Sequence, residues 1–169
     1  MIYEPAEDSY LLQKYVKELV RGKVLDMGTG SGVQALTALE NTKEVIAVDV
    51  NAEAVDFVKK KGVNGIVSDL FDSVNGKFDW IIFNPPYLPE DQNEPEDSKL
   101  ATTGGKKGSE VLEKFLKEAK DYLKPGGKIL VLVSSLTGDP EVMFKDYKYE
   151  CLEKKKVFFE ELVVYKLEP

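Results

Sequence analysis

The residues of this chain whose types best suit chemistry are Asn84, Pro85, Pro86 and Tyr87, which follow the apolar run 80–83. Asn84 offers a side-chain acceptor and two donors, the Pro85 carbonyl adds an acceptor, and Tyr87 adds a flat ring. Such a set can hold a planar NH2 group, orient its nitrogen towards an electrophile and stabilise the positive charge that it gains. The plainer interpretation is a turn that ends a strand, because proline cannot donate to a sheet ladder.

Four predicted strands must position this motif. They cover 23–27, 44–48, 65–67 and 78–83, and helical or turn patterns lie between them. This alternation predicts an α/β fold with a mostly parallel sheet. Ligands of such sheets bind at the carboxyl ends of the strands, so the end of 78–83 is where a reactive group would be presented.

The segment 28–32, Gly-Thr-Gly-Ser-Gly, lies between the first strand and a helix expected over 33–40. A strand, a glycine-rich turn and a helix in this order are typical of nucleotide-binding units. A dinucleotide fingerprint would need glycine where Val33 stands, and the Gly-Lys-Ser/Thr ending of a phosphate-binding loop is missing. We expect a turn that lets a ligand approach the backbone without a phosphate cradle; a glycine-rich helix entry without a ligand is the alternative.

Polar side chains mark the ends of all four strands. Asp26 belongs to the first, Asp49 to the second, where it can accept both hydroxyls of a ribose, and Asp69 to the third. Asp69 can accept an adenine amino hydrogen while Leu70 packs on the ring, although Asp69 can equally cap the next turn. With Asn84 at the fourth strand, these ends predict one continuous crevice. Carboxylates without phosphate-binding groups suit a cationic ligand with ribose and adenine but no phosphates, and S-adenosylmethionine fits that description.

The segments before the first strand and after the Asn-Pro-Pro-Tyr motif are predicted to have mainly structural roles. An amphipathic helix over 7–20 follows the segment Tyr3–Ser9, whose acids and hydroxyl favour N-capping over ligand contact. The segment 88–108, rich in proline, glycine and acids, is interpreted as a functional or mobile loop. Within it, Lys106 and Lys107 are more simply solvated charges than substrate contacts.

The C-terminal part completes an alternation without any repeat or linker, so 1–169 is expected to be one domain. In chain order, the sequence predicts a helix after Ser109, a turn at 125–127, a buried strand over 128–133, a short helix over 140–144, and closing strands over 147–152 and 157–166 joined through 153–156.

Charge and rare residue types exclude several classes of function. Thirty acidic against 23 basic residues give a net charge of −7, which disfavours nucleic acid as a substrate. The chain has no histidine and one cysteine, which excludes a disulfide framework, a Cys/His metal site and histidine acid/base catalysis. A signal-peptide pattern and a membrane-spanning run are not found, so we expect a cytoplasmic protein in a reducing compartment.

These motifs resemble the HemK/PrmC-type protein-glutamine methyltransferases, a family of class I S-adenosylmethionine-dependent enzymes. The resemblance covers nearly the whole chain and rests on Tyr3-Glu4-Pro5-Ala6-Glu7-Asp8-Ser9, Asp26-Met27-Gly28-Thr29-Gly30-Ser31-Gly32, Asp49, Asp69-Leu70, Asn84-Pro85-Pro86-Tyr87 and Gly104-Gly105. The opening motif resembles the short archaeal and eukaryotic branch, whose members modify the glutamine of the Gly-Gly-Gln motif in class I release factors. The Asn-Pro-Pro-Tyr motif also occurs in adenine and guanine amino-methyltransferases.

The resemblance implies a seven-stranded, mostly parallel sheet with an antiparallel last strand, helices on both faces, and direct methyl transfer to the amide nitrogen. The catalytic residues that it implies are Asn84, Pro85, Pro86 and Tyr87. The residues that it implies for S-adenosylmethionine are Ser9, Asp26, Gly28, Gly30, Asp49, Asp69, Leu70 and Asn84. Members of the short branch often pair with a small zinc-binding activator protein beside the third strand. A methyltransferase for RNA or DNA bases, a lysine methyltransferase and a non-catalytic cofactor-binding subunit are the alternatives.

Overall fold

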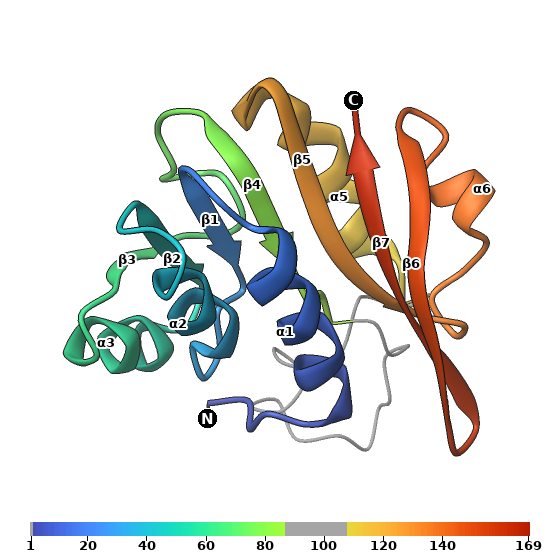
Figure 1. The fold of residues 1–169 in the computed structure, drawn as a ribbon, viewed down its shortest axis with the longest axis horizontal. Helices are drawn as coiled ribbons and strands as arrows, with labels where there is room; N and C mark the ends of the chain where they lie inside the picture. Colours follow the sequence, from blue (N-terminus) through green and yellow to red (C-terminus); the bar gives the residue numbers. More distant parts are fainter. Residues whose placement is uncertain (1, 87–107) are drawn as a thin grey trace.

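A computed structural model describes residues 2–86 and 108–169, and Figure 1 shows a twisted sheet with helices on both faces. Over the described residues, seven strands pair in the order β3-β2-β1-β4-β5-β7-β6. Their bounds are β1 Val24–Met27, β2 Val45–Asp49, β3 Asn64–Val67, β4 Phe78–Phe83, β5 Leu123–Ser134, β6 Lys148–Val157 and β7 Glu160–Glu168. β7 is antiparallel to β5 and β6, and the other neighbouring pairs are parallel. The expected α/β class with an antiparallel last strand is confirmed.

Each face of the sheet has its own apolar core. On one face Leu12 of α1 packs in a cluster with Ile82 and Leu130, and on the other the Phe83 and Phe115 rings lie 4.3 Å apart between centroids. The first face carries α1 Glu7–Leu19, α2 Val33–Leu39 and α3 Ala52–Lys60, and the second carries α5 Glu110–Ala119, the short helix η1 Lys120–Tyr122 and α6 Pro140–Met143. Within the described ranges, none of these helices has the length and apolar character to cross a bilayer.

The turn expected at 125–127 lies inside β5 and not before it. Leu123 pairs with Phe78 and Lys128 pairs with Trp80, so 124–127 bulge out of the ladder. A Cβ at Gly127 would lie 2.9 Å from the Phe78 carbonyl oxygen, which explains why glycine stands there. The prediction was wrong because a proline and two glycines mark a bulge as readily as a turn.

The last hairpin turns at Phe158 and Phe159, not through 153–156 as the sequence indicated. β6 includes 153–156, and the pairing with β7 continues until Val157 meets Glu160. The lysine-rich run was mistaken for a connection because its charges suggested a loop. It is instead part of an edge strand, where charged side chains discourage pairing with other chains.

Candidate active site

Asn84 stands at the end of β4, near the middle of the sheet. Phe83, the last strand residue, pairs with Met27 of β1 and Val131 of β5, and the ladder stops there as the prolines predict. Pro85 is buried, whereas Asn84 and Pro86 are partly exposed. Asn84 therefore continues a buried strand directly.

Tyr87, the fourth residue of the predicted catalytic motif, lies outside the described residues. The same holds for nearly all of the predicted loop 88–108, including Gly104, Gly105, Lys106 and Lys107. The roles expected for these residues stay predictions.

Asp8 fixes the orientation of the Asn84 amide. The Nδ2 group of Asn84 donates to Oδ2 of Asp8 at 3.0 Å, and the Tyr3 hydroxyl lies 3.1 and 3.0 Å from the two oxygens of the same carboxylate. A carboxylate only accepts, so the NH2 of Asn84 must face Asp8 and its Oδ1 must face away. Burial, together with the charge of Asp8, raises the pKa of the Tyr3 hydroxyl above its usual value, so this hydroxyl remains a donor.

The Oδ1 atom of Asn84 is buried and has no hydrogen-bond partner among the described residues. A buried acceptor left without a donor costs about 1–3 kcal/mol, so such atoms are rare in folded proteins. Rotation of the amide would leave its NH2 group without an acceptor and turn its oxygen towards the Asp8 carboxylate, where two acceptors would face each other. The Oδ1 atom of Asn84 thus has the capacity to accept a hydrogen bond from an N–H group.

Ser9 and Gln34 connect α1 to α2 beside this amide. The Ser9 hydroxyl oxygen lies 3.4 Å from the Ala6 nitrogen, which agrees with the expected N-capping. The backbone carbonyl of Ser9 accepts a hydrogen bond from Nε2 of Gln34 at 2.8 Å. The Oε1 atom of Gln34 is also buried without a partner in the part of the chain that the structure describes. Gln34 was not singled out from the sequence, and no sequence signal would have separated it from an ordinary helix residue.

The segment Tyr3–Ser9 was expected to act in N-capping, yet the Asp8 carboxylate accepts from Asn84 and the Tyr3 hydroxyl donates to Asp8. A sequence signal for Asp8 existed. Asp8, Leu12 and Val16 recur at intervals of four and share the buried face of α1. An acid on the apolar face of a helix indicates a partner elsewhere in the fold, since a buried carboxylate needs donors.

The glycine-rich turn after β1 depends on left-handed backbone angles. Gly28, Gly30 and Gly32 have φ values of 66°, 53° and 82°, which favour glycine. A Cβ at Gly32 would lie 2.6 Å from Cγ1 of Val58, so this glycine is also needed for close packing against α3. At Gly28 and Gly30 the nearest atoms are at least 3.5 Å away, so the backbone conformation alone requires glycine there.

Asp26 ties this turn to the start of α2. Its Oδ2 accepts from the Thr29 hydroxyl at 2.7 Å and from the Ala35 backbone nitrogen at 3.1 Å. The residue is 2% exposed, and burial raises the pKa of its carboxyl to about 7 although both hydrogen bonds oppose the rise. Asp26 lies inside β1, one residue before the strand end, and its main visible role is to shape the turn. A contact with a cofactor stays a prediction.

Asp49 ends β2 and joins it to the same turn. Its Oδ2 accepts from the Gly30 backbone nitrogen and its Oδ1 from the Asn51 backbone nitrogen, both at 2.9 Å. Each carboxylate oxygen has further acceptor capacity, so these bonds leave room for hydroxyl donors. Asp49 therefore positions the turn and can still serve a ligand.

Asp69 and Leu70 follow β3. The Asp69 side chain is largely exposed, with Oδ2 3.9 Å from Nζ of Lys114. Leu70 is buried with φ of 46°, and its carbonyl accepts from the Ser68 hydroxyl at 2.9 Å. A left-handed leucine is uncommon, and strained residues of this kind cluster at binding sites.

The four polar strand ends lie on neighbouring strands, in the order β3, β2, β1 and β4. Asp49 is bonded to the turn that Asp26 shapes, and Asn84 is bonded to Asp8 of α1. These residues therefore lie at or next to the ends of neighbouring strands, and the continuous crevice predicted from them stays a prediction. The separate ligand roles of the residues stay predictions.

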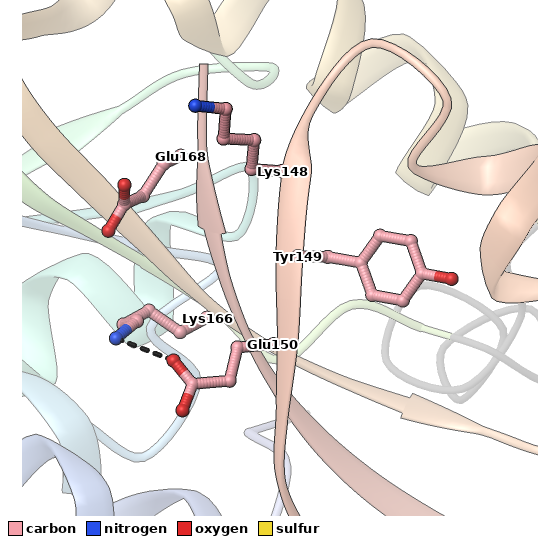
Figure 2. A pocket seen from close by; sticks show the side chains of 5 residues that line it. All are labelled: Lys148, Tyr149, Glu150, Lys166 and Glu168. Carbon is pink, nitrogen blue, oxygen red and sulfur yellow. Dashed lines mark ion pairs between the residues drawn. The ribbon is translucent and has the colours of Figure 1, made fainter.

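A charged hollow elsewhere on the sheet is a weaker candidate. Figure 2 shows it between β6 and β7. Part of its charge is neutralised by an ion pair in which Nζ of Lys166 lies 2.7 Å from Oε2 of Glu150. Its lining residues are Lys148, Tyr149, Glu150, Lys166 and Glu168. The start of β6 and the end of β7 meet there, at the end of the sheet opposite Asn84.

No group of three potential metal ligands gathers anywhere in 2–86 or 108–169.

Comparison with known proteins gives consistent matches. Residues 6–159 match the family described as methyltransferase small domain. The chain is 43% identical to a Methanocaldococcus jannaschii protein provisionally named a protein N5-glutamine methyltransferase, over 96% of this chain and 89% of that protein. It is 30% identical to the methyltransferase HEMK2 of Mus musculus, over 90% and 80% of the two chains.

A solved structure is similar over the same length. It is a chain of the E. cuniculi Mtq2–Trm112 complex, described as responsible for methylation of the translation termination factor eRF1. The TM-score is 0.79 at 28% identity, and the alignment covers 99% of this chain and 98% of the other.

Proposed function

Because this chain belongs to the protein N5-glutamine methyltransferases of the methyltransferase small domain family, we propose that it methylates the glutamine of a Gly-Gly-Gln motif in a class I release factor. The observation that carries the proposal is the buried Oδ1 of Asn84, which Asp8 holds in place without a partner in the described residues. A primary amide carries the N–H groups that such an acceptor needs. The acceptor therefore matches a glutamine side chain.

The acceptor amide is proposed to bind at the end of β4. Asn84 Oδ1 accepts one hydrogen of the glutamine NH2, the Pro85 carbonyl accepts the other, Pro86 stiffens the turn, and Tyr87 packs on the plane of the amide. An amide nitrogen is a poor nucleophile because its lone pair is delocalised. Two oxygens on its hydrogens orient that nitrogen and stabilise the positive charge that develops on it.

Asp8 acts through Asn84 and is a positioning residue in this proposal. Its carboxylate accepts from Nδ2 of Asn84, and this charge-assisted bond holds the Oδ1 atom towards the substrate. Tyr3 in turn donates to Asp8. No histidine or other strong base is needed, because the extra proton can leave after methyl transfer.

The residues around the glycine-rich turn fit S-adenosylmethionine, which supplies an electrophilic sulfonium methyl group when bound. Asp49 would accept the ribose hydroxyls with its remaining lone pairs, Asp69 would accept an adenine amino hydrogen, and Leu70 would offer an apolar surface to the ring. The Gly28 and Gly30 backbone would allow a close approach of the ligand. Ser9, Asp26 and Asn84 complete the proposed cofactor set.

A small activator protein is proposed to pair with β3. This strand is an edge of the sheet, its four residues include no charge, and Val67 is 50% exposed. An edge without charge or bulge can accept an added strand, and its protection against such addition is its short length. The E. cuniculi relative was solved in complex with Trm112, which supports a partner of this kind.

The decisive experiment is transfer of labelled methyl from S-adenosylmethionine to a recombinant class I release factor, with and without the candidate activator. A release factor carrying Gln→Ala in its Gly-Gly-Gln motif is the control. We expect label on the normal factor only, and a rate that increases with activator. Label on the control, or on RNA, DNA or lysine instead, would overturn the proposed substrate. Cofactor binding without transfer to any acceptor would favour a non-catalytic subunit.

A further inference from the structure

The turn between β6 and β7 exposes two aromatic side chains almost completely. Phe158 and Phe159 are 96% and 97% exposed, and they form the whole turn because Val157 pairs with Glu160. Two-residue hairpin turns are most easily made by Asn-Gly, whereas Phe158 adopts a left-handed φ of 40°. Neither ring is buried in the core. The two residues are therefore poorly explained by the stability of the fold.

This turn lies on the side of the molecule that carries the proposed active site. β6 runs in the same direction as β5, so it ends at the edge of the sheet where Asn84 stands. Figure 1 shows the hairpin reaching beyond the ends of the parallel strands. Glu160, directly after the turn, accepts from the Ser134 hydroxyl at the end of β5.

The residues that orient Asn84 gather at this same edge of the sheet. Tyr3 is bonded to Asp8, and Asp8 to Asn84. A macromolecule bound to the aromatic turn would lie at the same edge of the sheet as the acceptor site.

The strand leading to the turn is locally basic. Lys154, Lys155 and Lys156 are exposed on β6, although the whole chain has a net charge of −7. A cluster of positive charge on an acidic protein favours an acidic partner surface and discriminates against others. Aromatic side chains at the centre of a contact with charges around them are the usual composition of an energetically important interface.

We propose that Phe158, Phe159 and the run 154–156 form a docking tip for the protein substrate, which receives the two rings in an apolar surface bordered by carboxylates. The inference rests on the proposed function and deepens it. The amide pocket recognises a glutamine side chain, and the docking tip selects the folded protein that carries it. The run 154–156 would also attract anionic headgroups, but Glu160, Glu161 and the overall negative charge oppose them, so a protein surface is favoured and vesicle binding is tested below.

The test uses a variant that keeps the hairpin intact. Phe158→Gly combined with Phe159→Asn removes both rings and places glycine at the left-handed first position of the turn. Val142→Ala is the matched control, since Val142 is 68% exposed on α6. For transfer to the intact release factor, we expect the double variant to raise KM at least about tenfold, with kcat and S-adenosylmethionine affinity unchanged. The control should behave as the wild type.

A charge variant tests the second part of the docking tip. Lys154→Glu, Lys155→Glu and Lys156→Glu together should raise KM at low salt, and the difference from the wild type should shrink as salt is added. An unchanged KM in the aromatic variant, or a fall in kcat alone, would overturn the docking role. Binding of the wild type but not the aromatic variant to anionic vesicles, with equal KM values, would assign the turn to a lipid surface instead.

The same assay separates this inference from the function on which it rests. Transfer by the wild type with unaltered KM in both variants would overturn the docking tip only. Absence of transfer by the wild type to the release factor would overturn the proposed function and the docking tip together.

Discussion

The end of β4 and the glycine-rich turn after β1 lie on neighbouring strands but treat their polar groups in opposite ways. At the end of β4, Asp8 occupies the NH2 of Asn84 and leaves a buried oxygen without a partner in the described residues. Around the turn, the carboxylates of Asp26 and Asp49 are supplied with donors from the surrounding chain. The end of β4 keeps a buried oxygen without a donor, which lowers the stability of the fold. The turn is stabilised by hydrogen bonds from backbone and side-chain groups of the surrounding chain to the two carboxylates. This difference agrees with the proposed roles, in which the end of β4 is the reacting region and the glycine-rich turn is the region that holds the cofactor, the holding region.

The largest expected effect comes from removing the unsatisfied oxygen. Asn84→Ala should lower kcat about 10²–10³-fold, the size typical of losing one preorganised group that stabilises transition-state charge. Affinity for S-adenosylmethionine, measured by calorimetry, should change much less. Asn75→Ala, at an exposed position after β3, is the control. Equal losses of turnover and cofactor affinity in Asn84→Ala would remove the distinction between the two regions.

Asp8→Asn tests whether the oxygen must be held in place. Since the introduced side-chain amide could both donate and accept, the Asn84 amide would no longer have one preferred orientation. We expect kcat to fall roughly 10–50-fold with little change in cofactor affinity. Glu7→Gln removes the same charge from an exposed position of the same helix turn and should be neutral. Tyr3→Phe should give a smaller loss of kcat, because it removes one donor to Asp8 and leaves the bond to Asn84.

In the holding region, Asp49→Ala should weaken S-adenosylmethionine binding about tenfold, since it removes an acceptor proposed for the ribose and frees the Gly30 backbone. At saturating cofactor the value of kcat should return close to that of the wild type. Asp56→Ala, exposed on α3, is the control. A kcat that stays low at saturation would place Asp49 in the reacting region.

The smallest effect concerns the stability of the holding region and its dependence on pH. The carboxyl pKa of Asp26 is raised from 3.8 to about 7 in the folded chain, so the folded state binds this proton more tightly than the unfolded state. The free energy of unfolding should therefore fall as pH increases between these values, by about 1 kcal/mol from pH 6 to 7. Asp26→Asn should lack this component. Urea unfolding of both proteins at several pH values measures the difference, and parallel curves would contradict it.

The sequence predicted the order of strands and helices well because hydrophobic periodicity reports burial directly. The runs at 24–27, 45–49 and 78–83 are mostly apolar, each with one aspartate, since both faces of the sheet are covered by helices. The aligned strand ends followed from the same pattern. The polar contacts within the turn, by contrast, depend on side-chain directions that periodicity does not contain.

What the sequence missed depends on contacts between distant segments or on unusual backbone angles. The bond from Asn84 to Asp8 joins α1 to β4, and neither local pattern reveals the other. The final turn was misplaced because Phe158 adopts an angle that normally belongs to glycine or asparagine. Both failures concern residues to which we now assign function. Local rules fail where a residue serves something other than its own element.

The contact between Asp8 and Asn84 also has a consequence for how this protein folds and fails. The two residues are 76 positions apart, and α1 is held at its other side by a bond from Tyr15 to Glu153, which are 138 positions apart. Contacts of such long sequence separation close late, so no isolated fragment of the chain assembles the oriented amide. Partial detachment of α1 would release Asn84 while the sheet is still paired. On heating, activity should thus disappear before the sheet unfolds, because loss of α1 packing alone inactivates the site.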